Sequence, residues 1–429
     1  MSAPRPTDSR RVVVTGIGLI TSIGNNREEV LQSLREVRTG IEYFPPLDRA
    51  GVPVRLAGTV KGFDFPELHS DEWTLPDGYE ITRPQLRSMS PNVVYGFCAM
   101  QQAIADAKLP AELISNPRTG ALCASAGSPW LTYDYLDMML KKGPQRCNPM
   151  AMVASIAGTL NMNLVSCFGI KGASLGFSSA CASSAHALGF ALDKIRANRQ
   201  DIVFVAGAEE CNLFSILPFV GTRALTTQKD PAVSPCAFDV KRDGFAVGGG
   251  AAVLVLEELE HARRRGAPIH AELLGWGEAS DGYSVMAPEP EGEGLARAME
   301  AAIADSQISA SDVEYINAHG TATQIGDVAE GRAIKRVFNN GKRPFVSSTK
   351  SITGHGLSLA GAMESAFCCL ALEEGFTPVS ANITELDPQF ESIGVVTGPI
   401  DHAPKVALTN SSGFGGTNVA AIFRRWDEG

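Results

Sequence analysis

The feature that most constrains the fold of this chain is an internal repeat. AIADAKLPAEL at Ala103–Leu113 returns as AIADSQISASDV at Ala302–Val313, and GGGAAVLVL at Gly248–Leu256 returns as GGTNVAAIF at Gly415–Phe423. The two echoes occur in the same order, with offsets of about 170–200 residues. Repetition of this kind predicts two copies of one structural unit.

Each copy alternates short apolar strands with helices. Arg11–Thr15 and Asp201–Ala206 are strand-like runs, and the alternation is typical of a mostly parallel sheet covered by helices. A chain of 429 residues is also longer than the ~100–200 residues of one ordinary domain. We therefore predict an α/β fold of two domains, residues 1–262 and 263–429, with the repeat starting near residue 10.

One helix in each copy is predicted to be buried on every side. The stretch from Cys181 to about Arg196 is apolar or small through its first three turns, and Leu357–Leu372 has the same character. A helix without a polar face belongs in a core. We expect these two helices to pack closely in the centre of the molecule.

Charge and cysteine content exclude several classes of protein. With 37 basic and 47 acidic residues, the net charge of −10 does not suit a nucleic-acid-binding face. The nine cysteines form no CxxC pair, so no metal site or disulfide scaffold is expected. No apolar run reaches the ~18–20 residues of a membrane span, and no secretory signal is visible. We expect a reduced, cytoplasmic protein.

The glycines Gly16 and Gly18 imitate the start of a dinucleotide-binding loop. The third glycine is missing, and no acidic residue closes a second strand at the expected distance. We interpret this segment as a strand turning into a helix and expect no cofactor.

Cys181 stands at the head of the first buried helix, within GFSSACASSAH. Backbone N–H groups and the helix dipole at such a position favour the thiolate. A cysteine among alanines is also commonly a small buried hydrophobe. His186, five residues further on, is interpreted as a core histidine.

Two histidines follow strands of the second copy. His319 lies in NAHGTAT, and His355 lies in KSITGHG after the strand Phe345–Ser348. The carboxyl ends of strands are where α/β proteins place their ligands. Glu364 is the one ionised group in the apolar span that follows, and Lys350 is its nearest candidate partner.

The motifs GFSSACASSAH, NAHGTATQIGD, KSITGHG and NSSGFGGTN resemble, in order, the signatures of the β-ketoacyl–acyl carrier protein synthases. The resemblance is to the Cys-His-His condensing enzymes and runs nearly end to end. It implies the thiolase fold, a duplicated five-layered αβαβα architecture with two central buried helices. It also implies an acyltransferase, a 3-oxoacyl-[acyl-carrier-protein] synthase that lengthens fatty acyl chains by decarboxylative condensation with malonyl carrier protein.

The resemblance assigns the catalytic roles. Cys181 would hold the acyl group covalently, and His319 and His355 would donate hydrogen bonds to the enolate oxygen. Lys350 would orient His355 and hold Glu364 electrostatically.

Further roles follow from the same motifs. Phe414 would gate between acylation and condensation, and its backbone N–H would form the oxyanion hole with that of the nucleophile. Thr321 and Thr323 would contact the pantetheine arm. Asp327 and Glu330 match a structural pair and are not expected to be catalytic.

Three positions depart from the family pattern. Ser358 and Leu359 stand where the family usually has glycine and alanine, and Ser412 stands where it often has phenylalanine. We expect these changes to alter the acyl pocket or its gating.

The resemblance implies acyl carrier protein as a partner, and a homodimer or a heterodimer with a related chain. Strand Asp201–Ala206 is expected at the subunit interface. Basic side chains could form a patch for an acidic carrier protein, with scattered surface charge as the alternative interpretation. The candidates for this patch are Arg83, Arg87, Lys141, Lys142 and Arg146.

Other condensing enzymes match less well. A degradative thiolase needs a second reactive cysteine near its C-terminus, and this sequence has no cysteine beyond Cys369. An initiating Cys-His-Asn synthase would have asparagine in place of His355. A non-catalytic chain-length partner would lack Cys181. The alternative function that shares every catalytic residue is an elongating ketosynthase of a polyene or polyketide pathway, working with a partner subunit.

Overall fold

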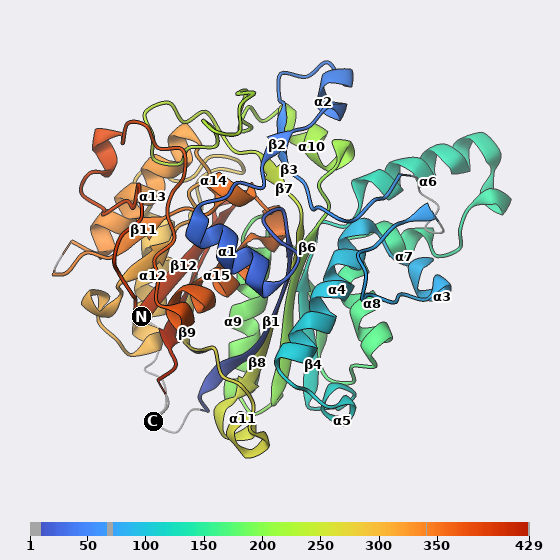
Figure 1. The fold of residues 1–429 in the computed structure, drawn as a ribbon, viewed down its shortest axis with the longest axis horizontal. Helices are drawn as coiled ribbons and strands as arrows, with labels where there is room; N and C mark the ends of the chain where they lie inside the picture. Colours follow the sequence, from blue (N-terminus) through green and yellow to red (C-terminus); the bar gives the residue numbers. More distant parts are fainter. Residues whose placement is uncertain (1–9, 67–71, 340, 428–429) are drawn as a thin grey trace.

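A ten-stranded sheet runs through the computed structural model, which describes residues 10–66, 72–339 and 341–427 (Figure 1). The order of the strands is β11-β10-β12-β13-β9-β1-β8-β6-β4-β5. In the first half the strands are β1 (Val12–Thr21), β4 (Thr119–Ala124), β5 (Ser174–Phe177), β6 (Ile202–Glu209) and β8 (Gly250–Glu258). In the second half they are β9 (Ala271–Ser280), β10 (Tyr315–Asn317), β11 (Phe345–Ser347), β12 (Val406–Gly413) and β13 (Thr417–Arg425).

The two halves of the sheet have the same topology. Outward from the centre, β1, β8, β6, β4 and β5 correspond to β9, β13, β12, β10 and β11. In each half the two inner pairs are antiparallel and the two outer pairs are parallel. The duplication is confirmed. The expectation of a mostly parallel sheet is wrong, because tight connections such as the glycine-rich turn between β12 and β13 reverse the chain.

Helices and sheet halves form five layers, as the resemblance implied. The helices α9 (Ser183–Arg196) and α15 (Ala360–Glu374) contact each other and strands of both halves, so they form the central layer. On the outer faces, α4 (Pro91–Asp106) and α8 (Thr159–Phe168) cover the first half. The second half is covered by α12 (Glu293–Ser306), against which α13 (Gln324–Val337) packs. The sheet halves join where Val12–Val14 pair with Ala271–Leu273.

Small residues let the central helices approach closely. A Cβ atom on Gly361 of α15 would lie 2.5 Å from the backbone nitrogen of Ala185 of α9. Every residue from Ala360 to Leu372 is buried. The predicted pair of buried central helices is therefore confirmed.

The remaining elements surround this core. The helices are α1 (Arg27–Glu36), α2 (Pro46–Arg49), α3 (Arg83–Leu86), α5 (Ala111–Ile114), α6 (Pro129–Lys142), α7 (Ala151–Ser155), α10 (Leu213–Val220), α11 (Leu259–Arg265) and α14 (Lys350–Thr353). A small sheet contains β2 (Glu42–Tyr43), β3 (Leu56–Gly58) and β7 (Val247–Gly248). Short 3₁₀ helices lie at Pro144–Arg146, Ala310–Asp312, Leu357–Leu359 and Pro388–Phe390.

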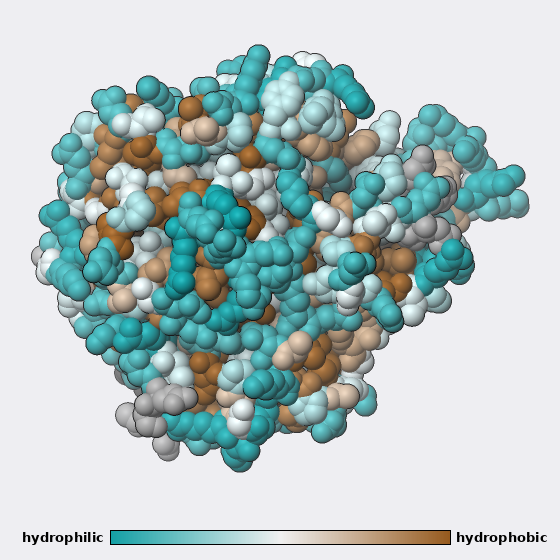
Figure 2. Space-filling view, viewed as in Figure 1, coloured by the Kyte–Doolittle hydropathy of each residue, from teal (hydrophilic) through white to brown (hydrophobic). Residues whose placement is uncertain are grey.

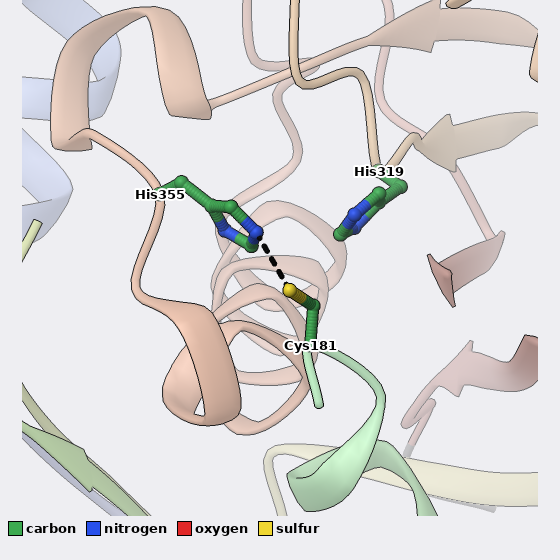
Figure 3. Close-up of side chains that lie close together, drawn as sticks. All are labelled: Cys181, His319 and His355. Carbon is green, nitrogen blue, oxygen red and sulfur yellow. Dashed lines mark hydrogen bonds between the residues drawn. The ribbon is translucent and has the colours of Figure 1, made fainter. Parts of the chain in front are cut away.

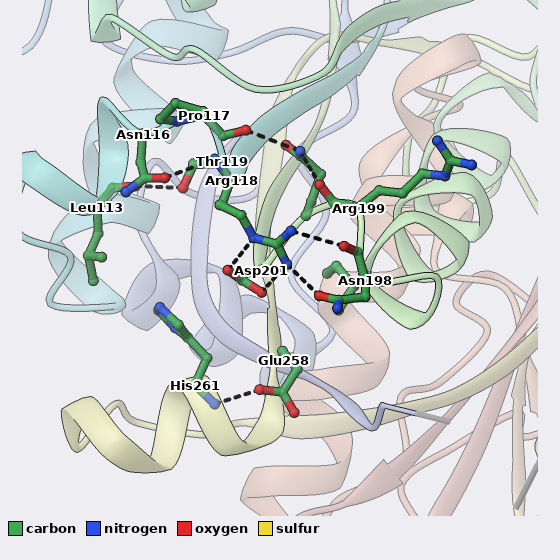
Figure 4. A network of polar contacts seen from close by, with 12 residues as sticks. Leu113, Asn116, Pro117, Arg118, Thr119, Asn198, Arg199, Asp201, Glu258 and His261 are labelled. Atoms are coloured by element: carbon green, nitrogen blue, oxygen red, sulfur yellow. Dashed lines mark hydrogen bonds and ion pairs between the residues drawn. The ribbon is translucent and has the colours of Figure 1, made fainter. Parts of the chain in front are cut away.

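The strand expected at a subunit interface is an inner strand of the sheet. β6 is hydrogen-bonded on both sides, to β8 and β4, and is buried throughout. Directly before this strand, the guanidinium group of Arg118 donates two hydrogen bonds of 2.6 and 2.7 Å to the carboxylate of Asp201 (Figure 4). The edge strand of this half is β5, whose residues Ser174–Gly176 are exposed. The expectation for Asp201–Ala206 is wrong, because two neighbouring strands already use its backbone.

The segment around Gly16 also differs from its interpretation. Gly16 and Gly18 lie inside β1, and the chain turns toward α1 only after Thr21. A Cβ atom on Gly18 would lie 1.8 Å from the carbonyl oxygen of Ala99, so glycine is needed for α4 to pack against β1.

The division after residue 262 stays a prediction, and in the structure that position lies within α11. Among the described residues, no helix is long and apolar enough to cross a membrane.

Candidate active site

A cavity of about 520 Å³ brings together residues from both halves. Cys181 comes from the first half, and His319 and His355 come from the second. Most of the predicted site residues line its walls, while Lys350 and Glu364 lie buried behind them. The predicted lining residues are Cys181, His319, Thr321, Thr323, His355 and Phe414.

Cys181 lies at a sharp turn two residues before α9. Ala180, the residue before it, has a φ of +49°, which is uncommon for a residue with a Cβ atom. Gly413 at the end of β12 packs against this turn, and a Cβ atom there would lie 2.7 Å from the carbonyl oxygen of Ser179. The glycine of the GFGG loop thus allows the two halves to meet at Cys181.

His355 faces Cys181 directly, with 3.1 Å between its Nε2 atom and the cysteine Sγ atom (Figure 3). The backbone of His355 is fixed by its N–H bond to Ala246, at 2.7 Å. On the ring, Nδ1 accepts the N–H of Leu357 at 3.3 Å. A neutral imidazole that accepts at Nδ1 carries its proton on Nε2. His355 therefore presents an N–H donor to the cysteine and to the cavity.

His319 lies on the other side of the sulfur. Its ring centroid is 5.1 Å from that of His355, with the ring planes at 84°. Its loop is held by Glu330, whose carboxylate accepts the N–H groups of His319 and Gly320 at 2.7 Å each. The role of Glu330 in the structure is thus to hold the histidine loop.

Both histidines are neutral near pH 7. Burial lowers the pKa of His319 and of His355 well below 6.5, and the positive charge of Lys350 lowers both further. Neutral rings can donate hydrogen bonds to a developing oxyanion without first losing a proton.

The donor set does not suit a metal ion, although the Cys181, His319 and His355 donor atoms all lie within 4.8 Å of one another. A metal on His355 Nε2 would require the proton to move to Nδ1, which already accepts the Leu357 N–H. The charge of Lys350 also opposes a cation here.

Lys350 and Glu364 form a buried ion pair between α14 and α15. Their side chains are 1% and 0% exposed, and the ammonium group hydrogen-bonds the carboxylate. Burial raises the pKa of Glu364 to about 7, while Lys350 acts in the opposite direction. Within the described part of the chain, Lys350 makes no hydrogen bond to His355, and the Leu357 N–H bonds that ring instead.

The pKa of the Cys181 thiol is shifted in the opposite direction from the one that the sequence predicted. Burial raises the pKa of Cys181 to about 12, and Lys350 only partly offsets this effect. The helix begins at Ser183, so the sulfur gains less from the helix end than a residue in the first turn would. The protonated thiol is therefore the resting form.

The remaining predicted residues line the entrance of the cavity. The hydroxyl groups of Thr321 and Thr323 lie 3.0 Å apart. Phe414 is 38% exposed, and its ring centroid is 6.5 Å from that of Phe219. Phe414 lines the same cavity as Cys181, and its role as a gate stays a prediction.

His186 lies outside the cavity lining. Its Nδ1 atom is 2.8 Å from the Ser179 hydroxyl, and its Nε2 atom is 3.0 Å from Glu278. The interpretation as a core histidine with its polar atoms satisfied is confirmed.

Sequence reasoning did not assign a role to Asn418, Asp281 or Glu209 near the site. Ser412 donates to Asn418 at 2.7 Å, and Asn418 donates to Asp281 at 2.7 Å, which ties the GFGG loop to a neighbouring loop. Glu209 is buried at the end of β6 and accepts the hydroxyl of Ser358. The sequence signal that could have indicated Glu209 was the acidic pair Glu209-Glu210 directly after the apolar run of residues 202–208.

Two like α/β halves that bring a cysteine and two histidines together at their junction are the arrangement that the resemblance to the condensing enzymes of the thiolase fold implies. The comparison with known families is specific. The family model described as "Beta-ketoacyl synthase, N-terminal domain" matches residues 9–262, and the one described as "Beta-ketoacyl synthase, C-terminal domain" matches residues 270–384. The chain belongs to the β-ketoacyl synthase family.

Curated relatives match over nearly the whole chain. "3-oxoacyl-[acyl-carrier-protein] synthase 1" of Haemophilus influenzae is 40% identical over 97% of this chain and 100% of its own length. The protein of the same name from Escherichia coli K12 is 40% identical over 97% of this chain and 99% of its own.

Solved structures agree with this family. A β-ketoacyl synthase from Burkholderia phymatum matches with a TM-score of 0.88 and 34% identity, over 97% of this chain and 100% of that one. The ishigamide ketosynthase/chain length factor matches with a TM-score of 0.85 and 30% identity, over 98% of this chain and 100% of that one. The AntDE:AntF complex of a type II PKS acyl-carrier protein with its ketosynthase matches at 0.86 and 28%, also over 98% and 100%.

Proposed function

We propose that the protein is a 3-oxoacyl-[acyl-carrier-protein] synthase in which Cys181, His319 and His355 perform the chemistry. The observation that carries this proposal is the 3.1 Å contact between the protonated Nε2 of His355 and the Cys181 sulfur, with His319 facing the same cavity. A nucleophile and two neutral hydrogen-bond donors suffice for acyl transfer and for enolate formation.

In the first half-reaction, Cys181 attacks the carbonyl carbon of an acyl thioester on the carrier protein. A bond forms from Sγ to the acyl carbon, the bond to the pantetheine sulfur breaks, and the thiol proton leaves with the pantetheine sulfur. The His355 N–H stabilises the sulfur as it loses its proton. Backbone N–H groups of Cys181 and Phe414 would hold the oxyanion.

In the second half-reaction, a malonyl thioester enters along Thr321 and Thr323. Carbon dioxide leaves, and the electron pair of the broken bond moves into an enolate whose oxygen accepts N–H bonds from His319 and His355. The enolate carbon attacks the acyl carbon on Cys181 and displaces the sulfur as a thiolate, which takes up a proton from water to restore the thiol. The product is a 3-oxoacyl thioester, longer by two carbons.

The partner of the reaction is proposed to be an acyl carrier protein. Lys141, Lys142 and Arg146 lie at the end of α6 and in the 3₁₀ helix that follows. The side chain of Asn148 donates to the backbone carbonyl of Arg87 at 3.0 Å, which places this segment beside Arg87, directly after α3. Hydrophilic side chains lie at the tip of the lobe at the right of Figure 2, where Figure 1 places α6, and this helix also exposes Leu136 and Leu140. A local basic face on an acidic chain suits an acidic carrier.

The protein is also proposed to form a dimer through β5. This strand has a neighbour on one side only and exposes Ser174–Gly176, and an open edge can pair with a second copy. Either an identical chain or a related ketosynthase-like chain could supply the second edge. The nine cysteines are all free, which supports a reducing, cytoplasmic compartment.

A polyene or polyketide elongating ketosynthase remains the second candidate. The specific observation in its favour is Ser412, which lines the cavity where the fatty acid enzymes often carry phenylalanine. An elongation assay with malonyl carrier protein and a series of acyl carrier proteins separates the two. One round of extension on saturated acyl groups supports the fatty acid enzyme, and several rounds without reduction support the other.

A further inference from the structure

The catalytic cavity is assembled from two halves of the chain, so the position of His355 relative to Cys181 depends on contacts between these halves. The backbone bonds of His355 to Ala246 and of Gly248 to His355 position its Cα atom but leave the ring free to turn. The ring packs edge-on against Phe245, with 4.9 Å between the ring centroids, and its Nδ1 atom accepts the N–H of Leu357 at 3.3 Å. The peptide group of Leu357 thus contributes the hydrogen bond that selects which ring nitrogen faces Cys181.

Leu357 is itself in a disfavoured conformation. Its φ is +51°, in the left-handed region that residues with a Cβ atom rarely adopt. Such a residue keeps this conformation only where its surroundings hold it. It starts the one-turn 3₁₀ helix Leu357–Leu359, and the contacts of the next residue, Ser358, add to the backbone bonds that hold this turn.

Ser358 reaches across to the other half of the molecule. Its hydroxyl donates to Glu209 at the end of β6, and its backbone N–H also bonds that carboxyl. Glu209 is 2% exposed and accepts the N–H of Ala126 at 2.9 Å, so it is fixed within the first half. The usual glycine at position 358 would offer no hydroxyl for this contact.

We propose that Ser358 and Glu209 are a positioning pair that holds the Leu357 peptide group, and through it the His355 ring, in line with the Cys181 sulfur. The inference rests on the proposed roles of Cys181 and His355. It extends them by assigning a function to a buried carboxyl and to a serine that departs from the family pattern.

The ionisation of Glu209 should change the reactivity of the Cys181 thiol with pH, an effect that a residue acting only through packing would not produce. Burial raises the pKa of Glu209 to about 8, so the group is a neutral acid at pH 7 and ionises above that value. The ionised form disfavours the thiolate of Cys181, whose pKa it raises. Glu210, directly after β6, also raises the pKa of Glu209. Lys350 on α14 lowers the pKa of Cys181, and Glu364 on α15 raises it.

The test compares Ser358→Ala with Ser365→Ala, a matched control on α15. Ser365 is 0% exposed, and its hydroxyl has no hydrogen-bond partner. Ser358→Ala should lower kcat for condensation about 10-fold at neutral pH, with KM for malonyl carrier protein within about twofold of wild type. Ser365→Ala should stay within about twofold in kcat. Equal kcat values for the two variants would overturn the proposal.

A second variant, Glu209→Gln, keeps the shape and the acceptor oxygen and removes the ionisation. Alkylation of Cys181 by iodoacetamide, followed by mass spectrometry, should be faster in this variant than in wild type above about pH 8 and equal to it near pH 7. Identical profiles would overturn the proposal. The melting temperature of each variant shows whether it is folded, and alkylation reports on the site even if the wild type fails to condense malonyl carrier protein. Failure of the proposed function is therefore distinguishable from failure of this inference.

Discussion

The ion pair between Lys350 and Glu364 allows a strong prediction, because neither charge reaches solvent. Replacing Lys350 with methionine keeps a side chain of similar length and leaves the carboxylate without a partner. Removing one member of a buried pair costs about 3–5 kcal/mol of unfolding free energy. We expect Lys350→Met to be destabilised by this amount at about pH 8, where the carboxyl would otherwise ionise.

The pH dependence of this loss follows from the sign of the pKa shift. Burial raises the pKa of Glu364 from 4.5 to about 7. Between these values the folded state binds more protons than the unfolded state, so stability falls as the pH rises and is fully present below about 4.5. Without Lys350 the pKa of Glu364 rises further, and the fall continues to higher pH. The penalty should therefore be smaller at about pH 5 than at about pH 8.

The assay is denaturant unfolding of wild type and variant at these two pH values. Lys342→Met is the control, because that ammonium group is 61% exposed and lies 3.2 Å from Glu314, an arrangement that contributes little. The double variant Lys350→Met, Glu364→Leu should regain most of the stability, since an apolar pair replaces the charges, while condensation stays lost. A stable single variant at about pH 8, or a double variant no more stable than the single, would refute the reasoning.

Four further outcomes are expected. After incubation with acyl carrier protein, peptide mapping should find one adduct, on Cys181, and label on another cysteine would contradict its role. His319→Ala should slow decarboxylation and condensation about 100–1,000-fold and leave acylation detectable, whereas loss of acylation alone would argue against the division of labour. Cys181→Gln should release carbon dioxide from malonyl carrier protein without product, and no histidine should titrate in the rate between about pH 6 and 8 because both histidines are neutral. A histidine titration in that range would be the contrary result. Gly413→Ala should impair acylation, because its Cβ atom would lie 2.7 Å from the Ser179 carbonyl oxygen, and an unchanged acylation rate in stopped-flow would count against the close approach.

Much of this protein could be predicted from local patterns in its sequence. The echo of Ala103–Leu113 at Ala302–Val313 predicted the duplication, and the apolar stretches after Cys181 and Leu357 predicted the central helices. The motifs around Cys181, His319 and His355 indicated the residues that the structure brings together. Patterns of this kind are readable because helical periodicity and turn residues act over a few neighbouring positions.

Other properties were decided only by the tertiary structure. The direction of the inner strands, the exposed edge at β5 and the buried position of Asp201–Ala206 depend on which strands pair, and loop-closing turns decide that over long separations. Burial raises the pKa of Cys181, although its position near a helix start predicted the opposite. The bond from Ser358 to Glu209 joins residues 149 positions apart. Desolvation and contacts between the two halves depend on distances in space, and a sequence specifies these only through the packing of the whole chain.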